Sequence, residues 1–264
     1  MRRGTISHEI DHFSGKTDEG GRRFLGAESA ARPPPETERL LESLRGLPYP
    51  ELKRLLACSD AIAGQNYRRF QEMDLRRNLT PALLAYQGIQ YRYMAPNVLE
   101  SGDYEWLQDR LRILSGFYGV LRPLDGVVSY RLEMGAKLRT PFCRDLYDFW
   151  GDKLARSLGE ETDLLLNLAS EEYARAVRRS LPKKVRMVDV IFAEDLGDRL
   201  VEKGVYVKMA RGEMVRFLAR TRGETLEDVE KFCGLSYRFA PERSEKDRLV
   251  FLRPDRARQK KEEN

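Results

Sequence analysis

The sequence predicts a single α+β domain in which a mixed β-sheet is surrounded by helices. Two observations predict this class. Segments with apolar residues at helical spacing and short apolar or alternating runs follow one another, but without a regular strand–helix–strand rhythm. No internal repeat is present. A length of 264 residues with a hydrophobic fraction of 41% is sufficient to bury one large core.

Residues 1–35 differ in composition from the rest of the chain. They contain five glycines and few apolar residues, and they end in three consecutive prolines. Such a segment buries too little apolar surface to offset the entropy of ordering it, so we expect a poorly packed arm. The α+β domain is then expected over residues 36–252, followed by a basic tail over residues 253–264.

The domain is expected to open with four helices. Pro50 and Pro81 suit the first turn of a helix, where a missing N–H costs nothing, and Ser59 and Thr80 are of the types that cap helix N-termini. Apolar residues recur at helical spacing after these positions. The predicted spans are 36–45, 50–56, 59–70 and 80–86.

The remaining elements mix helices and strands. The IQYRYM run alternates between apolar and polar residues and lies between Gly88 and Pro96, which predicts a strand over 89–94. Further helices are predicted over 103–114, 145–158, from Ser170 onward, and over 210–220. Further strands are predicted over 163–169, 185–193 and 205–209, with an antiparallel hairpin formed by 235–239 and 249–252.

The segment 111–137 carries the most informative functional pattern. Gly116 and Gly119 are spaced for a tight turn after a predicted helix, and Arg112 and Arg122 flank them. A glycine turn exposes backbone N–H groups, which together with guanidinium groups suit phosphate oxygens. This pattern therefore predicts a helix-hairpin-helix-like element near 103–125 that binds the DNA backbone. The alternative, an ordinary glycine cap at a helix end, stays open.

A second basic cluster lies where a predicted strand passes into a helix. Its basic residues are Lys208, Arg211 and Arg216, and a helix N-terminus is a natural site for an anion. A solvated basic helix face is the alternative. We expect both clusters to line one cleft that binds double-stranded DNA. The predicted contact set is Arg112, Ser115, Gly116, Tyr118, Gly119, Arg122, Lys208, Arg211 and Arg216.

The charge balance permits a nucleic-acid partner without demanding one. The net charge is +5, and 35 arginines outnumber 12 lysines. Arginine offers planar bidentate contacts to phosphate, but the same bias follows from a GC-rich genome.

Catalytic and metal-binding motifs find little support. His8 and His12 stand at the HExxH spacing, but they are the only histidines and lie in the polar arm, so we expect no metal there. Without another imidazole no catalytic triad is possible, and we expect neither an enzyme nor a cofactor. Three scattered cysteines, Cys58, Cys143 and Cys233, favour a reducing compartment. No run is long enough to span a membrane, so the cytoplasm is the expected location.

Several longer strings resemble a known family. The string LRILSGFYGVLRPLDGVVSYRLEMGAKL is followed by DLYDFWGDKL, NLASEEYARAV and KMARGEMVRFL. In this order they are similar to the YaaA peroxide-stress family, and the similarity runs from about residue 40 to residue 251.

The resemblance implies a bacterial cytosolic protein that is induced by hydrogen peroxide and limits free intracellular iron. It also implies an unusual α/β fold with a basic cleft, a helix-hairpin-helix element and binding to double-stranded DNA. It implies no enzymatic reaction. The matching positions are those of the two basic clusters described above.

The chain departs from the family at its N-terminus. Members typically open with an apolar strand that runs into Ser-Pro-Ala-Lys, whereas only Ile6 and Ser7 keep that pattern here. A phosphate site that depends on the missing lysine is therefore in doubt. A second class of function also stays open, in which the same basic cleft holds a phosphorylated small molecule as an enzyme or a binding protein.

Overall fold

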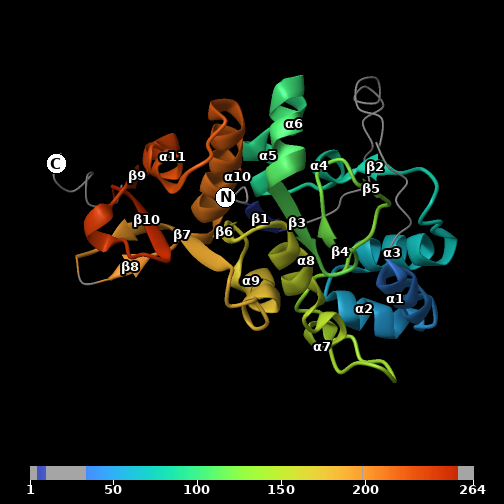
Figure 1. Ribbon diagram of the computed structural model, residues 1–264. Helices are drawn as coiled ribbons and strands as arrows, with labels where there is room; N and C mark the ends of the chain where they lie inside the picture. The colour runs from blue at the N-terminus through green and yellow to red at the C-terminus, as the bar shows by residue number, and fades with distance from the viewer. Residues whose placement is uncertain (1–4, 10–33, 198, 255–264) are drawn as a thin grey trace, which may run out of the picture.

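The computed structural model describes residues 5–9 (backbone only), 34–197 and 199–254. A mixed β-sheet forms the centre of the molecule, and helices cover both of its faces (Figure 1). This confirms the predicted α+β class. In spatial order the main sheet contains β4 (Gly119–Leu121), β3 (Leu111–Ser115), β1 (Thr5–Glu9), β6 (Leu164–Asn167), β7 (Arg186–Asp195), β10 (Arg248–Arg253) and β9 (Arg238–Phe239), with β8 (Leu200–Val201) beside β7.

The five central strands of the sheet, from β3 to β10, are parallel, and the flanking strands are antiparallel. Strand β3 is buried along its whole length, as expected for a strand covered on both faces. A separate two-stranded sheet pairs β2 (Thr80–Pro81) with β5 (Gly126–Val127).

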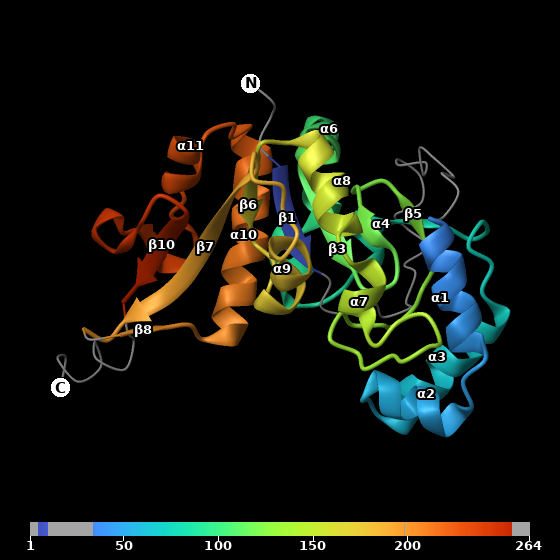
Figure 2. The same cartoon turned by 60° about the horizontal axis from the view of Figure 1, so that its bottom comes forward.

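Two groups of helices cover the sheet. On one face lie α5 (Ile89–Met94), α6 (Ser101–Arg110) and α10 (Gly204–Thr221), and on the other lie α8 (Lys153–Glu161) and α9 (Glu171–Arg178) (Figures 1 and 2). A third group lies beyond β4 at one end of the sheet and comprises α1 (Pro35–Arg45), α2 (Tyr49–Leu56) and α3 (Asp60–Glu72). The short helices are α4 (Ala82–Ala85), α7 (Leu146–Trp150) and α11 (Leu226–Glu230).

Strand β1 contradicts part of the predicted arm. Residues 5–9 pair with β3 on one side and with β6 on the other, which places them in the middle of the sheet. The prediction of a poorly packed arm over 1–35 is therefore wrong for these five residues. Hydrogen bonding on both edges of a strand comes from residues far away in sequence, which local composition cannot report. Residues 10–33 lie outside the described part of the chain, and α1 begins at Pro35.

The helices predicted from local signals are present. Helices α1, α2 and α3 match the first three predicted spans, and Ser59 accepts a hydrogen bond from the Ile62 N–H as the cap of α3. The fourth predicted helix is shorter than expected, because Thr80 and Pro81 belong to β2 and the helix covers Ala82–Ala85. The predicted strands at 163–169 and 185–193 correspond to β6 and β7. The predicted hairpin corresponds to β9 and β10.

Four predicted elements differ from the structure. Residues 89–94 form α5, and residues 205–209 form the first turns of α10, because the apolar residues of both segments continue at helical spacing in the packed molecule. The predicted helix over 103–114 ends at Arg110, and the next five residues form β3. The predicted helix over 145–158 is broken at Gly151, which separates α7 from α8 with a φ of 52°.

Candidate nucleic-acid interface

The 115–119 turn joins two strands of the sheet and not two helices. Ser115 at the end of β3 pairs with Gly119 at the start of β4. The Ser115 Oγ accepts the N–H groups of Phe117 and Tyr118 at 3.1 and 2.8 Å, and it shares a hydrogen bond with the Tyr130 hydroxyl. The predicted helix-hairpin-helix near 103–125 is therefore wrong, and the N–H groups expected to hold phosphate are bonded inside the protein.

Close packing explains the two glycines of this turn. A Cβ at Gly116 would lie 2.8 Å from the Leu132 carbonyl oxygen. Gly119 has a φ of 81°, and a Cβ there would lie 2.8 Å from the Trp150 ring. The Trp150 indole N–H donates to the Gly116 carbonyl at 3.0 Å, so the ring is fixed against the turn. The glycines thus allow close approach of the protein's own side chains and not of a ligand.

Tyr118 is also part of the core. Its side chain is 3% exposed, and its hydroxyl accepts the Val128 N–H at 3.1 Å. Burial raises the pKa of Tyr118 well above its usual value. All five residues of the 115–119 turn are buried, so the structure presents none of Ser115, Gly116, Tyr118 and Gly119 at the surface, and their contact with DNA stays a prediction that the geometry does not favour.

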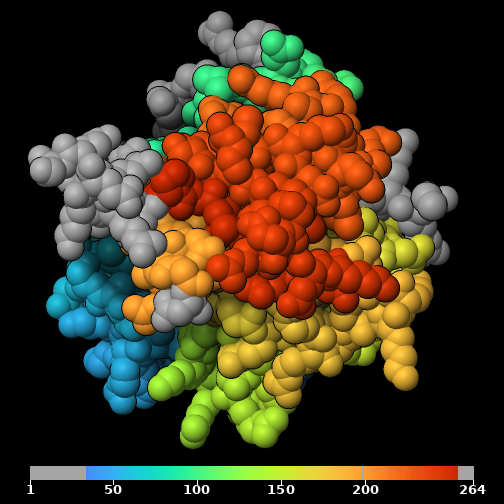
Figure 3. All heavy atoms as spheres, turned by 90° about the vertical axis from the view of Figure 1, so that its left-hand side faces the viewer, coloured from blue at the N-terminus to red at the C-terminus, as the bar shows by residue number. Residues whose placement is uncertain are grey.

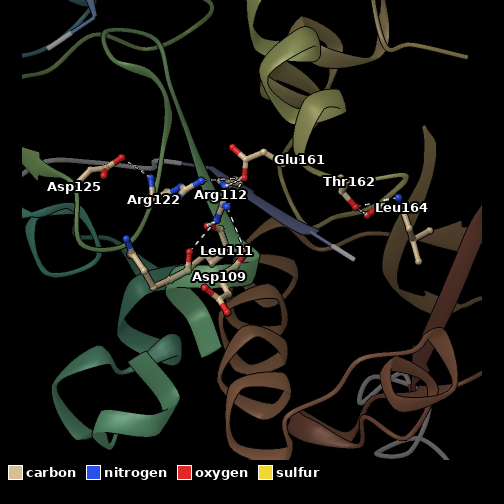
Figure 4. A network of polar contacts seen from close by, with 9 residues as sticks. Asp109, Leu111, Arg112, Arg122, Asp125, Glu161, Thr162 and Leu164 are labelled. Carbon is tan, nitrogen blue, oxygen red and sulfur yellow. Dashed lines mark hydrogen bonds and ion pairs between the residues drawn. The ribbon is translucent and has the colours of Figure 1, made fainter. Parts of the chain in front are cut away.

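Arg112 is a buried structural residue. It is 3% exposed, and its guanidinium donates to the carbonyl oxygens of Gln108 and Leu111 at 3.1 and 2.7 Å (Figure 4). Its Nε donates to the Glu161 carboxylate at 2.8 Å. Arg112 therefore caps the C-terminus of α6 and ties it to the end of α8, which leaves no donor for a phosphate. The geometry does not favour the predicted contact of Arg112 with DNA, because its donors are used inside the protein.

Arg122 lies beside this network but is more accessible. Its side chain is 52% exposed, and one guanidinium nitrogen lies 3.6 Å from the Glu161 carboxylate (Figure 4). The Asp125 carboxylate accepts the Arg122 backbone N–H at 2.7 Å. Burial raises the pKa of Asp125, and the hydrogen bond from Arg122 and the charges of Arg122 and Arg112 oppose that shift. Arg122 therefore shares one carboxylate with Arg112 at the amino end of β3.

The second predicted cluster lies on α10. This helix follows the β7–β8 hairpin, so its first turns, with Lys208 and Arg211, lie toward the carboxyl end of the sheet. Arg216 forms an ion pair with Glu213 at 2.5 Å and is 27% exposed. Arg112 and Arg122 lie at the opposite end of the parallel strands. The structure therefore does not bring the two clusters together into one cleft.

Helices α2 and α3 form a hairpin that the sequence patterns above do not mark as functional. Three residues, 57–59, join the two helices, and Ala57 adopts the left-handed conformation with φ 45° and ψ 47°. The first residues of α3, Asp60 and Ala61, are exposed. We call this unit the α2–α3 hairpin (49–72). It presents at the surface the N-terminus of α3, a helix of 13 residues and about 20 Å in length.

Basic side chains flank the α2–α3 hairpin. Arg54 on α2 and Arg68 on α3 are exposed, and neither has an ion-pair partner among the described residues. Lys53 differs from them, because its ammonium group lies 2.7 Å from the Asp60 carboxylate. The hydrogen bonds that Lys53 and Tyr49 donate to Asp60 hold the pKa of that carboxyl below its usual value. Lys53 thus offsets the acidic residue at the tip, and the two arginines stay available.

The sequence contains the signals for this hairpin. Pro50, the leucines of α2 and the Ser59 cap predict both helices, and the predicted spans leave a connection of two residues, 57 and 58. The connection has no glycine, and Ala57 takes the left-handed conformation that glycine usually supplies. Glycine spacing, the pattern that marks the 115–119 turn, is therefore absent from this connection.

Comparison with known proteins identifies the family. The family model described as peroxide stress protein YaaA matches residues 20–243 of this chain. The chain belongs to the YaaA peroxide-stress family. It is 50% identical over 218 residues to a UPF0246 protein of Desulfitobacterium hafniense, which covers 83% of this chain and 87% of the relative. UPF0246 proteins of Lachnoclostridium phytofermentans and Agathobacter rectalis are 49% and 45% identical over 218 residues, covering 83% of this chain and 86% and 88% of the relatives.

Strand order in this YaaA-family chain marks a second candidate region. Strand β3 lies on one side of β1, and β6, the next parallel strand along the chain, lies on the other side of β1. The order of the strands therefore reverses between β1 and β6. The carboxyl ends of strands at such a point are where open α/β sheets bind small molecules. At the carboxyl end of β6, Asn167 donates to Asp189 at 2.8 Å. The Arg178 side chain reaches the same carboxylate from the C-terminus of α9 and donates two hydrogen bonds of 3.0 Å to it.

Metal-binding groups and membrane-spanning helices are absent from the described residues. No group of three or more His, Cys, Asp or Glu side chains is placed to hold a metal ion there. His12 and the side chain of His8 lie outside that part of the chain, so the predicted absence of a metal at these positions stays a prediction. Across the same described ranges, no helix is long and apolar enough to cross a bilayer.

Proposed function

We propose that this YaaA-family protein contributes to peroxide defence by binding double-stranded DNA along its phosphate backbone, through the α2–α3 hairpin. One observation carries the proposal. The hairpin presents the N-terminus of α3 at the surface, with Arg54 and Arg68 on its two helices exposed and without an ion-pair partner among the described residues. Helix N-termini and guanidinium groups are the donors that bind phosphate oxygens.

The chemistry of the hairpin favours binding without base recognition. Contacts to phosphates position a protein on DNA but carry no direct sequence information, and most of the salt dependence of binding comes from them. The groups that the hairpin offers here are backbone N–H groups and two arginines, which suit phosphate oxygens. A net charge of +5 adds long-range attraction to a polyanion.

The experiment that tests this proposal is a salt titration of duplex binding. The protein should bind duplexes of unrelated sequence with similar affinity, and the logarithm of the affinity should fall linearly with the logarithm of the salt concentration. Replacing both Arg54 and Arg68 by Ala should lower that slope by about two and weaken all duplexes alike. The matched control is the exposed pair Arg144 and Arg156, each of which already pairs with an aspartate four residues away. Equal binding by both double variants would disprove the role of the hairpin.

The family also suggests a link to iron. We propose that the protein helps limit free intracellular iron and oxidative damage during peroxide stress. The measurement is electron paramagnetic resonance of chelator-accessible iron in cells with and without the protein, after exposure to peroxide. Higher iron in the cells that lack the protein is expected, and equal levels would contradict the proposal. Cells carrying the hairpin double variant then show whether the effect on iron requires DNA binding.

A phosphorylated small molecule is the second candidate ligand. The reversal of strand order between β1 and β6 favours it, together with the polar Asn167 at the carboxyl end of β6 and Lys208 and Arg211 on the first turns of α10. Equilibrium binding of nucleoside and sugar phosphates discriminates the two candidates. Binding that Lys208→Ala abolishes and that Arg54→Ala leaves unchanged would favour this second function.

A further inference from the structure

The connection between α9 and β7 is rich in basic residues. Five of its nine residues from 178 to 186 are basic, namely Arg178, Arg179, Lys183, Lys184 and Arg186. Arg178, Arg179, Lys183 and Lys184 are exposed. Figure 3 shows the gold part of the chain that contains this connection on the surface, below the red C-terminal segment. The segment precedes β7, so it lies at the amino end of the sheet.

Ion pairs divide these five cations into two groups. Arg178 donates to the Asp189 carboxylate at 3.0 Å, and Arg186 donates to the Asp247 carboxylate at 2.6 Å. These two arginines attach the ends of the connection to the sheet. Arg179, Lys183 and Lys184 have no ion-pair partner in the described ranges 34–197 and 199–254. Three positive charges therefore lie at the surface on a short stretch of backbone.

The backbone that carries the two lysines is held in a defined shape. The Val185 N–H donates to the Pro182 carbonyl at 2.8 Å, which closes a β-turn with Lys183 and Lys184 at its two central positions. Pro182 packs against α8, where a Cβ at Gly159 would lie 2.8 Å from the proline ring. We call this unit the 182–185 turn. A turn fixed at both ends loses little backbone entropy when its side chains bind a ligand.

An ordinary structural role explains only part of this surface. Cations near the C-terminus of a helix are stabilised by the helix dipole, and this accounts for Arg178 and Arg179 at the end of α9. It does not account for Lys183 and Lys184, which follow beyond the helix. A lysine binds phosphate through a point charge on a flexible side chain. Two adjacent lysines therefore suit a ligand with regularly spaced negative charges.

We propose that the 182–185 turn, together with Arg179, is a second phosphate-contacting surface for duplex DNA. This inference rests on the proposed DNA-binding function. The α2–α3 hairpin lies beyond β4, whereas the 182–185 turn leads into β7, four strands further along the sheet (Figures 1 and 2). At about 4.8 Å between strands, the two surfaces are separated by at least roughly 19 Å. Phe70 of α3 packs against Phe117 at the carboxyl end of β3, whereas the 182–185 turn lies at the amino end of the sheet, so the two surfaces are separate contacts for DNA.

The test compares salt titrations of four proteins on a duplex of about 40 base pairs, roughly four helical turns. Relative to the unmodified protein, the Lys183→Gln and Lys184→Gln double variant should bind several-fold more weakly. The slope of its log affinity against log salt concentration should be smaller in magnitude by about two. The Lys183→Arg and Lys184→Arg double variant should keep both values. The Arg144→Gln and Arg156→Gln double variant is the control for loss of two exposed charges. Circular dichroism verifies the fold of each.

The outcomes separate this inference from the proposed function. If the unmodified protein binds duplex DNA and the Lys183 and Lys184 glutamine variant keeps its affinity and salt dependence, the 182–185 turn is only a solvated basic turn and the inference is overturned. If the unmodified protein binds no duplex, the proposed function itself fails. Equal loss in the control and in the Lys183 and Lys184 variant would show a dependence on net charge alone, which also overturns the inference.

Discussion

The 115–119 turn and the α2–α3 hairpin are both short connections between regular elements, but their polar groups face opposite ways. In the 115–119 turn, the N–H groups of Phe117 and Tyr118 are bonded to Ser115, and the neighbouring Arg112 is bonded to backbone carbonyls and a carboxylate. In the hairpin, Arg54 and Arg68 are exposed and without an ion-pair partner among the described residues. Arginine is therefore a buried structural residue beside the 115–119 turn and an accessible surface residue on the hairpin, and glycine occurs in the turn but not in the connection 57–59 of the hairpin.

The difference shows what such motifs report. A glycine allows close approach to the backbone, and at Gly119 the close neighbour is the protein's own Trp150 ring and not a ligand. An arginine inside an apolar run, such as Arg112 in LRILS, indicates a buried ion pair, because an unpaired charge could not stay there. Four variants test this comparison, beginning with the largest expected effect.

Gly119→Val should destabilise the protein by about 3–5 kcal/mol. A β-branched residue is strained at a φ of 81°, and its Cβ would lie 2.8 Å from the Trp150 ring. Urea denaturation followed by tryptophan fluorescence measures the change in the free energy of unfolding. A loss below about 1 kcal/mol would show that the turn can move away from Trp150 and is not packed as described.

Arg112→Ala should cost about 3 kcal/mol, because it leaves the Glu161 carboxylate without its buried partner and removes the cap from the C-terminal carbonyls of α6. The matched control is Arg54→Ala, which should change the free energy of unfolding by no more than about 0.5 kcal/mol. Chemical denaturation of both variants gives the comparison. If the two substitutions changed the free energy of unfolding by similar amounts, Arg112 would not be a structural residue distinct from the surface residue Arg54.

Gly64→Ala should stabilise the protein by about 0.5–1 kcal/mol. Gly64 lies inside α3, and the nearest atom to an added methyl group would be a guanidinium nitrogen of Arg68 at 4.0 Å. The gain comes from the lower entropy of the unfolded chain and the better helix propensity of alanine. A thermal melt at matched protein concentration measures it. Destabilisation would indicate that the Arg68 side chain packs on the helix and is less available to phosphate than proposed.

The smallest expected effect is at Asp60, at the tip of the α2–α3 hairpin. Hydrogen bonds from Lys53 and Tyr49 lower the pKa of Asp60 in the folded protein. A lowered folded-state pKa stabilises the fold above the unfolded pKa, near 3.8, and this contribution disappears as the pH falls through the folded value. Asp60→Asn should therefore differ most in stability from the unmodified protein near neutral pH, and the difference should shrink as the pH falls below 3.8. A constant difference in urea denaturation across this range would contradict the role of the ion pair.

The parts of the fold that local signals determine can be predicted from the sequence. Helices α1 to α3 begin at prolines or at the Ser59 cap, and their leucines point to one core. Strand β1 cannot be predicted in this way, because its place depends on pairing with residues more than 100 positions away in sequence. The strand predictions at α5 and at the start of α10 fail because five or six residues cannot distinguish alternation from one face of a helix.

The structure does not favour the predicted site, for a related reason. Sequence reports that Arg112 and Arg211 are basic, but it does not report which end of the sheet each reaches or whether a carboxylate faces it. Glu161 lies 49 residues after Arg112 and provides its partner only once α8 is packed on the sheet. The hairpin could be found from its two helices and the short connection between them, since all of those signals are local.

The central position of β1 also sets the order in which the protein can be assembled on the ribosome. Strand β1 leaves the ribosome well before its neighbours β3 and β6, which begin only at residues 111 and 164. Until then its two edges lack their partners, and unpaired edges are where chains associate wrongly. The fifth parallel strand, β10, begins only at residue 248, so the sheet cannot close until nearly the whole chain has been synthesised, and we expect slow folding with a long interval during which a chaperone would be useful.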